Sequence, residues 1–168
     1  MTAVRPTGDV QRLGSSTTDE IHSACVDPRV GDNAEGGGAG FYFHLQPGTS
    51  FTGAGIWMPP RPLLGKLRDA IAEDPRGFER VVKNSSFVRR FGGLDDEHTL
   101  KRMPRGFDEA HPAARWLKFQ SFVSGRELSD KQVTSPRLAA VLQDDFSRLL
   151  PLVRWLNGAL GLKAATTR

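Results

Sequence analysis

The residue pattern changes abruptly at Gly40, where short segments rich in apolar residues begin. Residues 41–46 are rich in aromatic side chains and are bounded by glycine and proline, a pattern typical of a short strand. Residues 51–57 predict a second strand, and the residues between the two form a loop of hairpin length. Gly53 and Gly55 lie inside the second strand, where a missing side chain indicates a bulge or a close approach of backbone.

Helices account for much of the remaining pattern. A helix is predicted to begin near Pro62, because proline suits a first helical turn and apolar residues follow at intervals of four. Asp74 and Pro75 indicate the N-cap and first turn of a second helix. The longest helix is predicted after Ser135 and Pro136, with an apolar stripe that advances by three or four residues. The stripe consists of Leu138, Leu142, Phe146, Leu149, Val153, Leu156 and Leu160.

Pro151 lies inside this last helical pattern. Proline has no N–H to donate to the carbonyl of Ser147, and its ring clashes with that carbonyl. We therefore expect either a kink within residues 147–151 or two helices in sequence.

Weaker signals surround these elements. Ser129 and Gln132 have the spacing of a capping box, which opens another short helix. The pattern predicts no helix or strand within residues 84–99, only a turn at Gly92 and Gly93. The remaining expectations are a short strand at 100–103, a brief helix from 111 to 116 and a strand within 119–128.

Together these elements predict an α+β fold, with short antiparallel strands packed against helices and a long kinked amphipathic helix at the end. Residues 1–38 show no sustained period and end in consecutive glycines, so we expect a disordered or atypical segment there. The folded domain is expected to span residues 39–162, and residues 163–168 are expected to form a disordered tail.

Charge narrows the classes of partner. The 168-residue chain has a formal net charge of +4, and the excess lies in residues 76–118, where ten Lys and Arg stand against six Asp and Glu. Such an excess attracts an anionic partner at long range. Nucleic acid is a weaker candidate, because specific binders usually carry a denser basic stripe with interleaved aromatics.

Composition also bears on the compartment. Cys25 is the single cysteine, so no internal disulfide can form. No apolar run approaches the roughly 20 residues that a membrane span needs, and the first residues lack the apolar stretch of a secretory signal. We therefore expect a cytoplasmic chain with no membrane association.

Residues 100–112 hold the densest group of chemically useful side chains. Lys101, Arg102 and Arg105 lie there, and Lys118 follows a short way downstream. These cations could surround an anion, with arginine able to clamp it through two parallel hydrogen bonds. The alternative is a cationic surface exposed to solvent.

Asp108 and His111 are three residues apart in the same loop. Contact between them would orient the imidazole as in general-base catalysis. The competing interpretation, which we favour, is a structural staple that holds the loop. The four histidines are far apart in the sequence and no nucleotide-binding motif is present, so we predict no metal site and no cofactor.

Several segments in order resemble the domain of unknown function 2461 family. They are residues 41–48, 53–59, 100–112, 117–118, 128–130, 135–136, 151–153 and 156–157. The resemblance implies an α+β domain whose activity is unassigned. The family pattern also has a first half, with an Arg-Asp-x-Arg-Phe-Ser segment, that residues 1–35 do not match. The resemblance therefore implies a truncated member.

Three interpretations of function follow. The leading one is a domain of unknown function that binds an anionic small molecule, with Trp57 and residues 102–111 lining the site. The second is a hydrolase-like enzyme in which Asp108 orients His111 and Arg102 or Arg105 stabilises a developing anion. The third is a truncated member without function.

Overall fold

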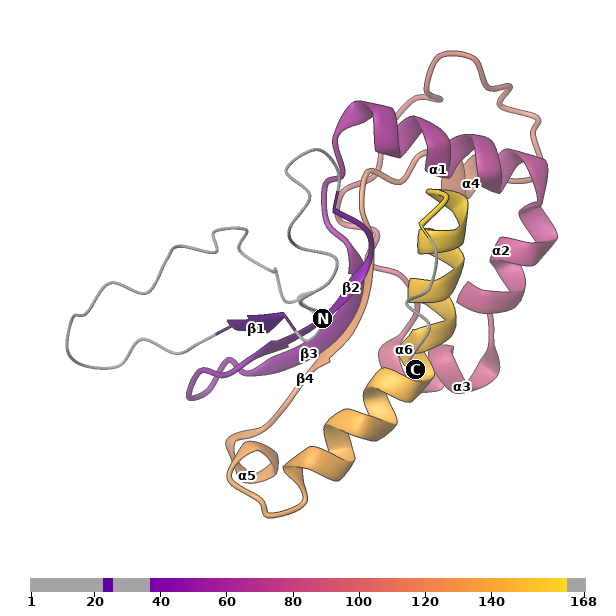
Figure 1. Cartoon of the computed structure of the whole chain (residues 1–168). Coiled ribbons are helices and arrows are strands. Elements are labelled where there is room, and N and C mark those ends of the chain that lie inside the picture. The colour runs from indigo at the N-terminus through magenta and orange to yellow at the C-terminus, as the bar shows by residue number, and fades with distance from the viewer. Residues whose placement is uncertain (1–22, 26–36, 163–168) are drawn as a thin grey trace, which may run out of the picture.

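Residues 23–25 and 37–162 are the part of the chain that the computed structural model describes (Figure 1). The disordered tail expected at residues 163–168, and most of the segment expected at residues 1–38, lie outside these residues. Within that segment the backbone of Ser23–Cys25 forms strand β1, an element that the sequence pattern does not predict.

An antiparallel sheet forms one layer of the domain. Its strands are β1, β2 (Gly40–His44), β3 (Phe51–Ile56) and β4 (Phe122–Glu127), in the order β1-β2-β3-β4. The strands predicted at 41–46, 51–57 and within 119–128 are thus confirmed. Gly55 has a φ of 132° and pairs with Val123 of β4, where a Cβ atom would overlap the carbonyl of Phe122.

Helices form a second layer and cover one face of the sheet (Figure 1). The helices are α1 (Arg61–Glu73), α2 (Pro75–Val82), α3 (Ser85–Phe91), α4 (Ala114–Leu117), α5 (Asp130–Val133) and α6 (Leu138–Ala159). This arrangement confirms the α+β class. The cap at Asp74 and the capping box of Ser129 and Gln132 are both formed.

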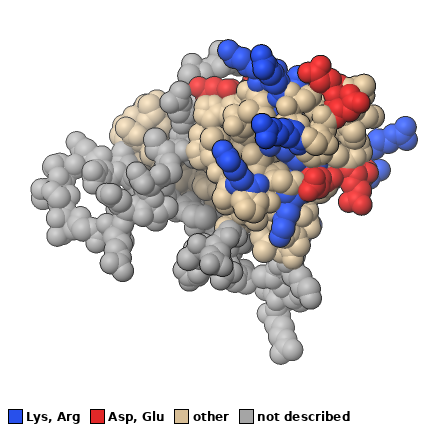
Figure 2. Space-filling model, turned by 90° about the horizontal axis from the view of Figure 1, so that it is seen from above, with Lys and Arg blue, Asp and Glu red and all other residues tan. Residues whose placement is uncertain are grey.

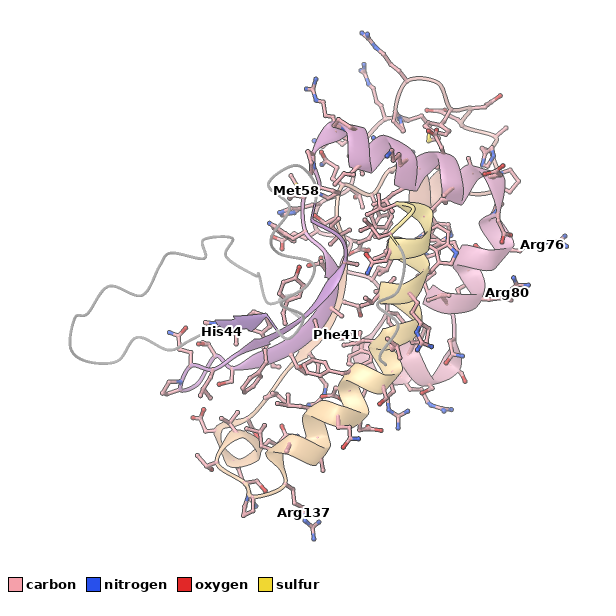
Figure 3. The ribbon with its side chains drawn as sticks, in the orientation of Figure 1. Phe41, His44, Met58, Arg76, Arg80 and Arg137 are labelled. Carbon is pink, nitrogen blue, oxygen red and sulfur yellow. The ribbon has the colours of Figure 1, made fainter. Side chains whose placement is uncertain are left out.

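The core lies between the sheet and α6. Phe41 of β2 points toward α6 (Figure 3), where its ring lies 5.0 Å from that of Phe146. Phe78 of α2 is fully buried and contacts the rings of Trp116 and Phe122 at centroid distances of 5.6 and 6.0 Å. Aromatic packing of this kind adds to the burial of apolar surface, and it fixes α2 and α4 against the sheet.

Helix α6 runs without interruption through Pro151. It changes direction about midway along its length (Figure 1), as expected where proline removes the hydrogen bond to the carbonyl of Ser147. The kink is therefore confirmed, and the alternative of two separate helices is wrong.

Two segments differ from the sequence prediction. Residues 84–99 contain α3, which begins after an N-cap by Asn84 and ends at Gly92 with a φ of 81°. The strand predicted at 100–103 is wrong. Thr99 and Phe119 form an isolated bridge, and of residues 100–103 only Leu100 continues it, by donating to the carbonyl of Lys118. The chain before Lys118 is helix α4, so residues 101–103 have no strand to pair with.

Candidate functional site

Trp57 and His98 meet at the end of the sheet where β3 leads into α1. Their ring centroids are 4.8 Å apart at an interplanar angle of 48°, and both side chains are half-buried. The contact joins two segments that are far apart in the sequence. It leaves an aromatic surface that is partly open to solvent.

A short antiparallel pairing brings Lys118 to the same place. The N–H of Leu100 donates to the carbonyl of Lys118 at 2.7 Å, and the N–H of Gln120 donates to the carbonyl of His98 at 3.0 Å. Between them Phe119 points into the core and is 2% exposed. Lys118 and Gln120 flank Phe119 in this pairing, and Lys118 is also the C-cap of α4.

Met58 follows Trp57 and has an unusual backbone. Its φ is 41°, its side chain is 48% exposed, and its N–H donates to the Oγ of Ser121 at 3.0 Å. Figure 3 places it at the end of β3. A left-handed conformation in a residue other than glycine costs free energy, and such conformations are concentrated at functional sites. We call Trp57, Met58, His98, Lys101 and Lys118 the Trp57 cluster.

The lysines of the Trp57 cluster have no ion-pair partner among the described residues. Lys101 is exposed and Lys118 half-buried, and within residues 37–162 no acidic side chain forms an ion pair with either of them. Arg68 of α1 supports the same segment by donating to the carbonyl of Phe119 at 3.1 Å. Burial lowers the pKa of Arg68, and its Nε has no hydrogen-bond partner in the described structure.

The loop of residues 101–113 projects beyond α1 (Figure 1). Met103 and Phe107 are partly buried and pack against the core, whereas Arg102 and Arg105 are exposed. Of the five predicted binding residues, the structure therefore gathers Trp57, Lys101 and Lys118 around the paired segments. The other two lie farther along the loop.

Asp108 and His111 each hold a turn of this loop. The carboxylate of Asp108 accepts from the N–H of Ala110 at 2.9 Å, and Nδ1 of His111 accepts from the N–H of Ala113 at 3.1 Å. Only their backbones are hydrogen bonded to each other, from the N–H of His111 to the carbonyl of Asp108. Since Nδ1 accepts this hydrogen bond, the N–H of the neutral imidazole is on Nε2.

Sequence reasoning did not identify Asp145, the one fully buried charged residue in the described ranges. Its carboxylate lies 2.7 Å from Nε of Arg90 and 2.7 Å from Nη2 of Arg126. A signal was present, because Asp145 stands four residues before Leu149 on the apolar side of the helix. A charge at such a position needs buried partners.

Two cavities lie away from the Trp57 cluster. One, of about 670 Å³, runs beside β4 and is bordered by Tyr42, Gly125 and the residues that follow α3. The other, of about 610 Å³, opens between α2, α3 and α6. None of the seven residues singled out in the loop region or at Trp57 lines either cavity.

The described residues meet neither the requirement of a three-ligand metal site nor that of a membrane-spanning helix. No group of three or more His, Cys, Asp or Glu side chains within the described ranges is arranged to hold a metal ion. No helix in the same part of the chain is long and apolar enough to cross a bilayer.

The sequence matches the model of a known protein family. The family model described as conserved hypothetical protein (DUF2461) matches residues 21–155. No curated protein and no solved structure gives a significant match. The match covers most of the chain and includes all four strands and most of α6. The chain belongs to the DUF2461 family, whose function is unknown.

Proposed function

We propose that this domain binds an anionic small molecule at the Trp57 cluster. The observation that supports the proposal best is the tilted ring contact between Trp57 and His98 at 4.8 Å, beside the paired segment that carries Lys118. Aromatic surface and convergent polar groups together are the usual composition of a ligand site. The aromatic pair supplies the surface, and the lysines supply the charge.

The two lysines act as mobile point charges rather than as a rigid fork. Asp96 and Glu97 directly precede His98 in the sequence, so the favourable side for an anion is that of Lys101 and Lys118. Binding at a partly exposed site of this kind is weakened by salt. The proposal therefore includes a salt-dependent affinity.

The distribution of charge favours a small ligand over a nucleic-acid backbone. Figure 2 looks down on the end of the molecule that carries α1, and there Lys and Arg side chains project at several separate points, with Asp and Glu between and beside them. A nucleic acid is usually bound by a more continuous basic stripe. A single anion needs only two or three cations.

The enzyme interpretation has less support. Nδ1 of His111 and the carboxylate of Asp108 are both occupied by N–H groups of their own loop. Asp108 therefore does not orient His111, and a general base there would depend on the imidazole alone. These contacts favour the structural staple.

Titration with pyrophosphate and with citrate, followed by tryptophan fluorescence, tests the proposal. Lys118→Gln should weaken binding about fivefold to tenfold, since each partly screened charge contributes about 1 kcal/mol. Lys131→Gln is the matched control, because Lys131 is exposed in α5 at the other end of the molecule. Equal affinities for the two variants, or no binding of either anion at millimolar concentration, would contradict the proposal.

A further inference from the structure

The cavity between α2, α3 and α6 is distinct from the Trp57 cluster. Its apolar wall is formed by Val81, Phe87, Pro151 and Trp155. Trp155 is held in place by Phe78, whose ring lies 4.6 Å away. The volume of about 610 Å³ falls within the range of small-molecule sites. We call this cavity the α2–α6 cleft.

Arg148 supplies a guanidinium to the α2–α6 cleft, held in place by an ion pair with Asp144. Its Nε and Nη2 donate to the two carboxylate oxygens of Asp144 at 2.9 and 3.0 Å, and its Nη1 donates to the Oγ of Ser86 at 2.6 Å. The hydrogen bonds and charge of Asp144 raise the pKa of Arg148. The guanidinium has five N–H groups, so two of them are left for a ligand.

Ser86 and Asn84 add donors beside Arg148. Because Oγ of Ser86 accepts from Arg148, its own O–H is free to donate. The Oδ1 of Asn84 is occupied by the N–H groups of Ser86 and Phe87, which leaves its amide N–H groups as donors. All three side chains line the cleft. Each of the three keeps at least one donor, and donors that converge in one place suit an anion.

Two other charged residues border the cleft. Asp74 lines it, but one carboxylate oxygen accepts from the N–H of Gly77 at 2.8 Å as the cap of α2. Arg80 lies at the rim and extends into solvent (Figure 3). The polar end of a ligand would therefore meet Arg148, and its apolar part would lie on Pro151 and Trp155.

We propose that the α2–α6 cleft binds an organic anion that carries one carboxylate or phosphate group on a flat apolar body. The acid group would accept from Arg148, Ser86 and Asn84. The apolar body would cover Trp155 and Pro151. This site is independent of the anion site proposed above.

Calorimetry on the full 168-residue chain tests this inference with three related probes. They are 2-naphthoate, 2-naphthyl phosphate and the neutral 2-naphthamide. At least one anion should bind more than tenfold more tightly than the amide, and the tighter of the two identifies the acid group. Equal affinities for all three, or no binding of either anion at millimolar concentration, would overturn the inference.

Variants then locate the site. Arg148→Gln should weaken the favoured anion about tenfold, whereas Arg154→Gln, an exposed arginine on the same helix, should leave its affinity unchanged. Ser86→Ala should weaken binding of the favoured anion about threefold. This variant replaces Arg148→Gln in the test if Arg148→Gln does not fold. Loss of affinity in Lys118→Gln alone would assign the probe to the Trp57 cluster and overturn the inference.

Discussion

The fully buried carboxylate of Asp145 lies 2.7 Å from Nη2 of Arg126 and so joins α6 to β4. A second arginine, Arg90 of α3, approaches its other oxygen at the same distance. One carboxylate thus connects two helices and an edge strand through charge-assisted hydrogen bonds. The contact helps to hold α3, which has only seven residues and buries Phe87 alone.

Asp145→Asn should lower the free energy of unfolding by about 3 kcal/mol, since it leaves two arginines without the buried negative charge that they share. Urea denaturation measures the loss. Asp144→Asn is the matched control, because Asp144 is 47% exposed and its ion pairs are screened by water. Similar unfolding midpoints for the two variants would show that the buried contact does not stabilise the fold.

Gly55→Ala should destabilise the sheet by about 3 kcal/mol. The φ of 132° is rarely adopted by other residues, and a Cβ atom there would overlap the carbonyl of Phe122 across the strand pair. Gly158→Ala, in α6 with open space around it, should instead stabilise by about 0.5 to 1 kcal/mol. Thermal unfolding of both variants gives the test. A loss of stability in both would show that the chain does not tolerate added side chains in general, and would contradict a special requirement at Gly55.

The free energy of unfolding should fall at low pH, partly because Glu79 becomes protonated. Hydrogen bonds from Lys83 and then from Trp116 lower the pKa of Glu79 below 4.5. The contribution of ionised Glu79 to the free energy of unfolding is therefore complete above about pH 4.5. It is lost as the pH falls through the lower pKa of Glu79 in the folded state. Glu79→Gln should flatten this part of the stability curve. An unchanged curve between pH 5 and pH 3 would contradict the assignment.

His111→Ala should act on stability and not on binding. Loss of the bond from the N–H of Ala113 to Nδ1 should cost about 1 kcal/mol, measured by urea denaturation, while the affinity for pyrophosphate stays unchanged. A hydrolytic activity that disappears in this variant with binding intact would favour the enzyme interpretation instead.

Local signals in the sequence predicted local structure well. Asp74 caps α2, and Ser129 with Gln132 caps α5, because each cap needs only its own neighbours. The bend in α6 follows in the same way from the N–H that Pro151 lacks. Strand β4 was predicted from its apolar residues, although its pairing with β3 could not be read from either segment alone.

Long-range contacts explain what sequence reasoning did not find. The contact between Trp57 and His98 spans two loops and has no periodic signal. Helix α3 has too few residues for an apolar stripe, although Asn84 is a good cap. Residues 101–103 form no strand, because the segment before Lys118 with which they would pair is helix α4. The donors of the α2–α6 cleft come from two helices and converge only in the fold.

The most direct test of anion binding at the Trp57 cluster is a titration of the ¹⁵N-labelled chain with pyrophosphate, followed by amide chemical shifts. The proposal predicts that the largest changes fall in residues 57–58, 98–101 and 118–121, and that Lys118→Gln reduces them while Lys131→Gln does not. Changes confined to other segments, or none at millimolar pyrophosphate, would contradict it.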